Sequence, residues 1–218
     1  MKFRFGLRGH LLFVFLLAVA LSPAPAQQSG ERFPHVNQER LWGTLEKLSE
    51  FGRPPGAGFE GGVTRLAFSE EDLAARQYVM GLMRDAGLEV RVDPAGNIFG
   101  RRAGTEPLPA LLFGSHIDSV PHGGNFDGDV GSLGALEVMR ALSEHGVRTR
   151  HPLEMAIWTN EEGHHYGMVL FGSGAAAGVL TPDLLERRDE QGKSVADWLR
   201  RYGQDPARLL DARIKPGA

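Results

Sequence analysis

A strand–helix–strand pattern between residues 109 and 158 limits the folds open to this chain more than any other stretch. Residues 109–113 and 152–158 are short apolar runs, each typical of a buried strand. Residues 130–145 lie between them and spread leucine, valine and methionine over one broad helical face. A strand, a helix and a second strand in this order form a right-handed crossover with two parallel strands. The pattern predicts an α/β fold with a mixed, mainly parallel sheet flanked by helices.

Side chains able to bind a metal follow both predicted strands and precede the helix. His116 follows the first strand, Asp127 precedes the helix, and Glu161 and Glu162 follow the second strand. Parallel strands end at the same edge of a sheet, and open α/β sheets bind ligands there. We therefore expect these donors to converge. Imidazole and carboxylate ligands suit zinc, manganese or nickel, and two ions can share a carboxylate placed between them.

Two short spacings indicate different roles for neighbouring acids. Asp118 lies two residues after His116, so both side chains point to the same side of an extended chain. The Asp118 carboxylate can then accept the second N–H of the imidazole and orient the ring. Glu161 and Glu162 are adjacent, and adjacent side chains of an extended chain point apart. This favours one metal ligand and one proton carrier over two equivalent ligands.

Each signal alone has a more common structural explanation. A lone His-x-Asp pair is most often a capped or core histidine, adjacent glutamates usually belong to a solvated loop, and Asp-Gly is usually a turn. Their combination at predicted strand ends favours the metal interpretation. His164 and His165 follow the glutamates, but we expect them to be structural or to face the substrate. Arg65 could meet a substrate carboxylate or be an ordinary surface or salt-bridged arginine.

Turn and capping residues predict the remaining elements. A helix is expected over residues 37–51, and another from a Ser69 cap to residue 86. Short strands are expected over residues 88–92 and 98–101, on either side of a Pro-Ala-Gly-Asn turn. Further caps are predicted at Thr181, Ser194 and Asp205.

The stretches that carry these donors resemble one enzyme family. They read Gly-Ser-His-Ile-Asp-Ser-Val-Pro from residue 114, Gly-Gly-Asn-Phe-Asp-Gly from residue 123 and Thr-Asn-Glu-Glu-Gly from residue 159. All three are similar to the metal-dependent hydantoinase/carbamoylase amidases, among them N-carbamoyl-L-amino-acid hydrolases and allantoate amidohydrolases. That family belongs with the two-zinc aminoacylases and carboxypeptidases. Residues 61–69 and 92–100 resemble its amino-terminal portion, and the resemblance as a whole covers residues 36–218.

The resemblance implies a site, a reaction and an assembly. By it, His116 binds one of two divalent ions, Asp127 bridges both ions, and Glu162 binds the other. Zinc is the first expectation, with manganese, nickel or cobalt as alternatives. Glu161 would be the general base and Asp118 would steer His116. The implied reaction is hydrolysis of a linear amide or ureido C–N bond in a small N-carbamoyl or ureido substrate, by an enzyme that forms a homodimer when complete.

Members of the family continue beyond the point where this sequence stops. By the resemblance, a later histidine would complete the His116 site, a lid or dimerisation domain would follow, and a last histidine would complete the Glu162 site. We therefore expect residues 36–218 to form the amino-terminal part of the catalytic domain and to be incomplete and inactive as given. Two alternatives stay open, an aminoacylase or dipeptidase of the same clan and a catalytically silent module. The Phe-Asp-Gly sequence ending at residue 128 favours the carbamoylase side.

The amino terminus is typical of a secretory signal peptide. Lys2, Arg4 and Arg8 precede an apolar run over residues 11–21 that is too short to span a bilayer. Ala-Pro-Ala, ending at residue 26, is a suitable cleavage site. We therefore expect residues 1–26 to be a signal peptide, residues 27–35 a flexible leader, and the mature protein to be periplasmic without a stable membrane span.

Composition excludes several other classes of function. The chain has no cysteine, so it can have no disulfide, thiol nucleophile or thiolate metal site. Cleavage would remove three cations and no acids, so the formal net charge of −3 would become −6. A mildly acidic chain gives no support for nucleic-acid binding.

Overall fold

The computed structural model describes residues 34–215 of the chain. The expected signal peptide and residues 27–33 of the expected leader lie outside this range. Among the helices of the described range, none has the length and apolar character needed to cross a membrane.

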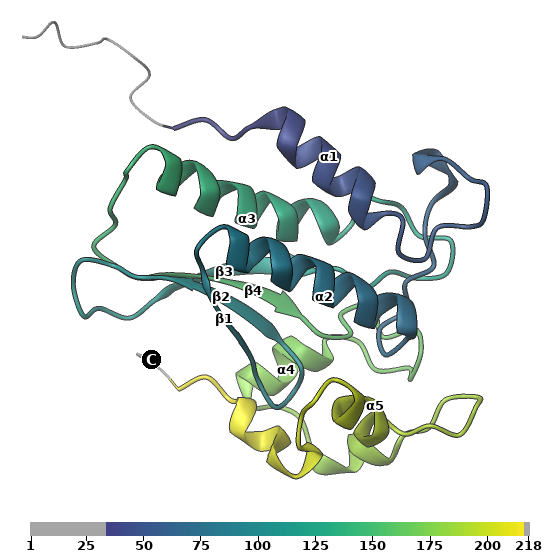
Figure 1. Ribbon diagram of the computed structural model, residues 1–218. Helices are drawn as coiled ribbons and strands as arrows, with labels where there is room; N and C mark the ends of the chain where they lie inside the picture. The colour runs from purple at the N-terminus through teal and green to yellow at the C-terminus, as the bar shows by residue number, and fades with distance from the viewer. Residues whose placement is uncertain (1–33, 216–218) are drawn as a thin grey trace, which may run out of the picture. The chain divides into compact units, whose positions relative to one another are not determined.

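A four-stranded sheet lies at the centre of the described residues, in the strand order β1-β2-β4-β3 (Figure 1). β1 (Glu89–Val92) and β2 (Ile98–Arg102) form the predicted hairpin, and β2 pairs antiparallel with β4 (Leu153–Trp158). β4 pairs in parallel with β3 (Leu111–His116), and α3 (Asp129–Glu144) connects these two strands. The predicted α/β fold and strand–helix–strand connection are confirmed, although the parallel share of this mixed sheet is smaller than predicted.

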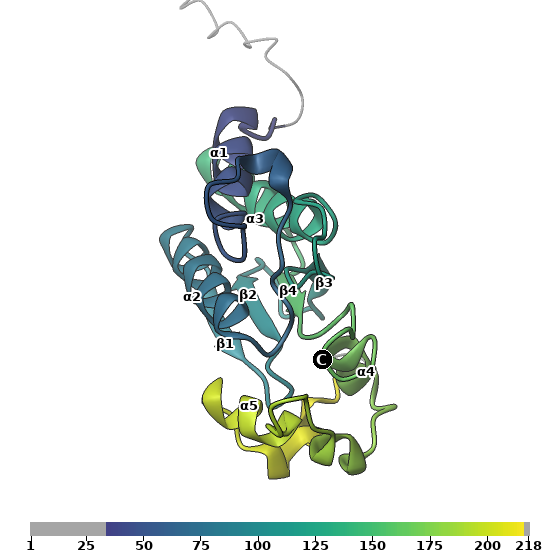
Figure 2. The same ribbon diagram turned by 90° about the vertical axis from the view of Figure 1, so that its right-hand side faces the viewer.

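Three helices lie over one face of the sheet (Figures 1 and 2). α2 (Glu70–Asp85) packs against β1 and β2, α3 packs against β3 and β4, and α1 (Gln38–Leu48) packs on α3. Apolar side chains between the helices and the sheet form the main core. Its fully buried members include Leu48, Val79, Met83, Ile98, Leu136, Met139, Met155 and Ile157.

The chain after β4 builds a second, smaller apolar cluster below the sheet in Figure 1. Its elements are α4 (Phe171–Ala177), α5 (Val195–Arg201) and two 3₁₀ helices, η2 (Pro182–Glu186) and η3 (Pro206–Ala212). Buried members of this cluster include Phe68, which comes from the segment before α2, and Tyr166, Phe171, Val195, Trp198, Leu199 and Leu209.

Most of the predicted helix caps are confirmed. The Ser69 side chain accepts the Asp72 N–H at the start of α2, and Ser194 forms a reciprocal capping box with Asp197 at the start of α5. Asp205 caps η3 by accepting the Ala207 N–H. Thr181 precedes η2 but makes no side-chain cap hydrogen bond, so this predicted cap is wrong.

The third strand differs from its prediction in position and in burial. β3 runs to His116, so this histidine is the last residue of the strand rather than a residue beyond it. β3 is also an edge strand, and its first two residues, Leu111 and Leu112, are 53 % and 39 % exposed. An apolar run does not distinguish a central strand from an edge strand, and the expectation of a buried strand was wrong here.

The buried Arg65 side chain connects several segments near the amino-terminal end of α3. The side chain is 1 % exposed and pairs with both carboxylate oxygens of Asp129, at 2.8 and 2.7 Å. Its remaining N–H groups donate to the carbonyl oxygens of Leu48, Phe51 and Ile117. A buried guanidinium is tolerated because each of its donor groups has a partner. Of the two roles left open for Arg65, the structure therefore supports the salt-bridged arginine.

Replacing Arg65 should destabilise the fold strongly. Burial raises the pKa of Asp129 to about 6 against the opposing effect of Arg65, so Arg65→Met would leave a buried carboxylate without its partner. We expect a loss of ~3–5 kcal/mol in the free energy of unfolding, measured by urea denaturation. Arg150→Ala, which breaks an exposed pair with Glu106, is the matched control and should cause no comparable change. An Arg65→Met protein as stable as this control would contradict the assignment.

Candidate active site

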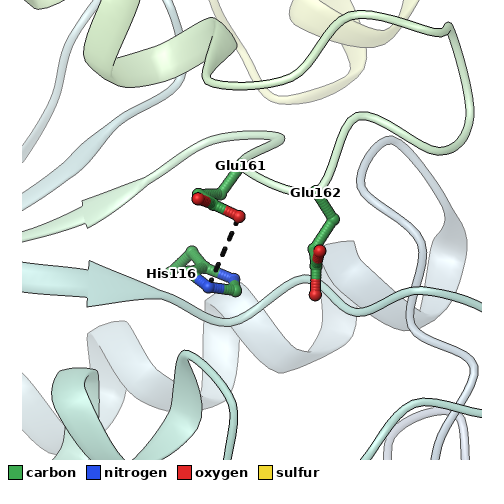
Figure 3. A group of neighbouring side chains, drawn as sticks. All are labelled: His116, Glu161 and Glu162. Carbon is green, nitrogen blue, oxygen red and sulfur yellow. Dashed lines mark ion pairs between the residues drawn. The ribbon is translucent and has the colours of Figure 1, made fainter.

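The parallel pairing of β3 and β4 brings the predicted donors to one edge of the sheet. His116 ends β3 opposite Trp158, and Glu161 follows three residues after β4 ends. The His116 Nε2 atom lies 3.6 Å from Glu161 Oε2 and 3.9 Å from Asp127 Oδ1 (Figure 3 shows the first contact). The predicted convergence of residues far apart in sequence is therefore present in the structure.

His116, Glu161 and Glu162 form a group with the spacing of metal ligands. Each offers one ligand atom, and these atoms all lie within 4.8 Å of one another. The two glutamates leave the loop in different directions, but both carboxylates reach the neighbourhood of the imidazole (Figure 3). The chain bends here, with Asn160 in a left-handed conformation at φ +52°, so the expectation based on an extended chain does not hold. The geometry allows either glutamate to be a ligand.

The His116 ring is oriented by the main chain of Asp118. Nδ1 lies 3.0 Å from the Asp118 carbonyl oxygen and 3.7 Å from a carboxylate oxygen of the same residue. Because a carbonyl oxygen can only accept, Nδ1 carries a proton in this contact, and Nε2 is the ring nitrogen that faces Asp127 and Glu161. Asp118 was expected to hold the ring with its carboxylate, and the structure instead gives the closer contact to its carbonyl. The result for His116 is the same, a ring held through Nδ1 with Nε2 directed at the carboxylates.

The Asp118 carboxylate instead holds the backbone of the two glutamates. Its oxygens accept the N–H groups of Glu161 and Glu162, each at 3.2 Å. Burial, together with the charge of the nearby Asp72, raises the pKa of Asp118 to about 6, although His116 and the two amide hydrogen bonds oppose the shift. Asp118 thus fixes the imidazole ring with its main chain and the backbone of the two glutamates with its side chain.

Gly128 leaves the space that the His116 ring occupies. It lies directly before α3 with φ +67°, and a Cβ built there would lie 2.5–2.7 Å from three imidazole atoms. Any larger residue would displace the ring as well as strain the backbone. The Asp-Gly sequence predicted only a turn, so this contact with His116 was missed.

An aromatic cluster directs Asp127 toward the site from outside. Phe126 packs against Phe59 of η1 (Phe59–Gly61) with ring centroids 5.5 Å apart, and Phe59 packs against Trp42 of α1 at 5.2 Å. Asn125 also donates to the Phe59 carbonyl oxygen. With Phe126 held on this side, the adjacent Asp127 faces His116, and its side chain is 79 % exposed.

The other residues considered as ligands lie elsewhere or have structural partners. His165 places Nδ1 3.0 Å from the Ala67 carbonyl oxygen and Nε2 3.7 Å from Asp189, which supports the structural role expected for it. His164 is exposed and does not belong to the donor group.

The donor set fits a divalent cation. An imidazole nitrogen lies near three carboxylates, those of Asp127, Glu161 and Glu162. Burial raises the pKa of Glu162, and the neighbouring charges of Asp127 and Glu161 raise it further, while His116 opposes the shift. Like charges gathered at this spacing repel one another, and a cation of the kind that imidazole and carboxylates bind would relieve that repulsion.

Known proteins are similar to this chain in sequence and fold. Residues 97–188 match the model of peptidase family M28. The chain is 46 % identical over 183 residues to an N-carbamoyl-L-amino acid amidohydrolase of Geobacillus stearothermophilus, covering 84 % of this chain and 44 % of that protein. It is 39 % identical over 161 residues to the allantoate amidohydrolase of Bacillus subtilis, covering 73 % of this chain and 38 % of that protein.

A solved structure with the same fold carries the family name. The amidase of the hydantoinase/carbamoylase family from Burkholderia multivorans superposes with a TM-score of 0.72 at 44 % identity, over 77 % of this chain and 40 % of that one. The chain thus spans less than half the length of the relatives that it matches. On its sequence and its fold, the chain belongs to the hydantoinase/carbamoylase amidase family.

Proposed function

We propose that this chain supplies metal-binding and proton-transfer residues to an amidohydrolase that cleaves linear amide or ureido C–N bonds. The observation that carries the proposal is the group of His116, Glu161 and Glu162, whose ligand atoms lie within 4.8 Å of one another at the edge of the sheet. The relatives named for N-carbamoyl-L-amino acids and for allantoate support a small N-carbamoyl or ureido substrate. Because the chain spans less than half of those relatives, activity, substrate and homodimeric assembly are proposed for the whole protein.

The donor atoms divide between two ions in this proposal. His116 and Asp127 would hold the first ion, and Asp127 and Glu162 would hold the second. Zinc is the proposed metal, with manganese, nickel or cobalt as alternatives for the same donors. When bound, such ions polarise a substrate carbonyl and lower the pKa of a water molecule.

Glu161 is the proposed general base. Its side chain is 33 % exposed, so water can reach it, and its backbone N–H is held by the Asp118 carboxylate. The carboxylate would take a proton from the attacking water and return it to the leaving nitrogen. With a carbamoyl substrate, the products are an amino acid, ammonia and carbon dioxide.

A second candidate function is an aminoacylase or dipeptidase activity. The match of residues 97–188 to a peptidase family favours it. The two functions can be separated in a chimera, in which the matched segment of this chain replaces its counterpart in the Geobacillus stearothermophilus protein. Faster turnover of N-carbamoyl amino acids than of N-acyl amino acids and dipeptides by this chimera would support the first function.

Replacing Glu161 should reduce turnover without removing metal. Glu161→Gln keeps the shape of the side chain but removes a carboxylate able to accept a proton. In the chimera we expect turnover to fall by roughly two orders of magnitude or more, with near-normal metal content by mass spectrometry. Glu162→Gln is the matched control and should lose metal. Metal loss in Glu161→Gln equal to that in Glu162→Gln would mean that the two roles are reversed.

Replacing Asp127 should weaken the binding of both ions. In the 218-residue protein, we expect Asp127→Ala to reduce zinc affinity by more than the ~10–100-fold typical of losing a residue that only supports a ligand. Competition with a chromophoric chelator measures this change. Glu144→Ala removes an exposed carboxylate from the far end of α3 and should leave the affinity unchanged. Near-normal affinity in a folded Asp127→Ala protein would contradict the bridging role.

Export to the periplasm is a further proposal, supported by the basic start, the short apolar run and the Ala-Pro-Ala sequence ending at residue 26. Mass spectrometry of protein from a periplasmic extract should give Gln27 as the amino terminus. Replacing Ala24 and Ala26 with bulky residues should block cleavage and retain the precursor. A cytoplasmic product that keeps Met1 would contradict the proposal.

A further inference from the structure

The segment of residues 159–172, called the glutamate loop below, consists of the loop after β4 and the first two residues of α4. It carries Glu161 and Glu162, and both of its ends contact the side chain of Asn97. At the first end, the Thr159 N–H donates to Asn97 Oδ1 at 3.0 Å. At the second end, Asn97 Nδ2 donates to the Gly172 carbonyl oxygen at 2.9 Å. The two ends also bind each other, since the Gly172 N–H donates to the Thr159 carbonyl oxygen at 2.7 Å. Asn97 thus closes the base of the glutamate loop.

The orientation of the Asn97 carboxamide is fixed from its other side. Asn97 lies in the turn between β1 and β2 and is fully buried. Its Nδ2 also donates to the Asp93 carboxylate at 2.8 Å, and the Asn97 and Ala95 N–H groups donate to the same carboxylate, each at 2.9 Å. A carboxylate can only accept, so the amide nitrogen must face Asp93 and the oxygen must face Thr159. The side chain is therefore held in the one orientation that serves both loop ends.

The contact between Gly172 and the Asn97 carboxamide is too close for a side chain at position 172. A Cβ built on Gly172 would lie 2.0 Å from Asn97 Oδ1 and 2.4 Å from the Thr159 nitrogen. Glycine at this position allows the second end of the loop to approach the carboxamide closely. A shift of Asn97 would therefore reach both ends of the loop together.

Further hydrogen bonds within and around the glutamate loop fix the backbone of Glu161 and Glu162 relative to its closed base. The Asp118 carboxylate accepts the Glu161 and Glu162 N–H groups, and the Leu170 N–H donates to the Glu161 carbonyl oxygen at 2.9 Å. Only Asn160 separates Thr159 from Glu161. The backbone of the two glutamates is thus held by hydrogen bonds to Asp118 and by the base of the loop, which Asn97 closes.

We propose that Asn97 is a positioning residue that acts through Thr159 and Gly172 to hold Glu161 and Glu162 beside His116. It touches none of the proposed ligand atoms and works only through the loop. Removing its carboxamide leaves the Thr159 N–H and the Gly172 carbonyl without their buried partner, which favours opening of the loop. The inference rests on the proposed function, because it assigns to the loop the task of holding two glutamates at the proposed metal centre.

The test compares Asn97→Ala with Met139→Ala in the 218-residue protein. Met139 is fully buried in the main core, on α3 and well along the helix from Asp127, so its truncation destabilises the fold without touching the loop. Amide hydrogen exchange is measured over residues 159–172 together with zinc affinity by chelator competition. In Asn97→Ala we expect exchange across the loop to rise selectively and zinc affinity to fall by about tenfold or more, the scale of losing a group that orients ligands. In Met139→Ala we expect zinc affinity within about twofold of the parent, a change far below that scale.

A second variant of Asn97 and the metal affinity of the parent protein separate failure of folding, failure of the positioning role and failure of metal binding. If Asn97→Ala does not fold, Asn97→Ser keeps a neutral polar side chain that is too short to reach both loop ends, and it should change exchange and affinity in the same direction. Unchanged loop exchange in a folded Asn97 variant, or equal effects in Met139→Ala, would overturn the positioning role. If the parent protein binds no zinc, manganese or nickel, metal binding by this chain alone fails, and the exchange comparison still decides the role of Asn97.

Discussion

The parallel pairing of β3 with β4 is the constraint on which the candidate site depends. Its register sets His116 opposite Trp158, so both strands end at one edge. The loop after β4 and the loop before α3 then have to pass that edge, and they bring Glu161, Glu162 and Asp127 to the imidazole. A slip of one residue in either strand would turn the ring to the other face of the sheet. The chemistry of the site therefore rests on main-chain hydrogen bonds between β3 and β4 as well as on the donor side chains.

A second level of organisation surrounds this pairing and consists of buried polar side chains. Arg65 joins α1 and α3, Asp118 joins β3 to the glutamates, and Asn97 joins the β1–β2 turn to the loop after β4. Each has a partner for the groups that face the interior, which is the condition for burying them at acceptable cost. These residues determine where the loops lie, whereas the apolar core determines where the helices and strands lie.

The sequence predicted the elements that depend on periodicity and capping, and it placed the donors at one edge. Helix α2 and the strand–helix–strand unit of β3, α3 and β4 follow from such local patterns. It did not predict which oxygen of Asp118 meets His116, because that choice depends on the backbone path after β3 ends. Nor did it predict that both glutamates approach one imidazole, because the left-handed Asn160 bends the chain. The role of Asn97 also needed the structure, since its partners lie 62 and 75 residues away in sequence.

The exposure of Asp127 has a kinetic consequence for the proposed metal centre. This carboxylate faces solvent while His116 beside it is almost fully buried, so an arriving cation would meet the charge of Asp127 before it meets the imidazole. Attraction by an exposed charge speeds association and is screened over about 10 Å at 0.1 M salt. Once an ion has shed water and reached Nε2, screening acts on it much less. Added salt should therefore slow the entry of metal far more than it speeds its escape.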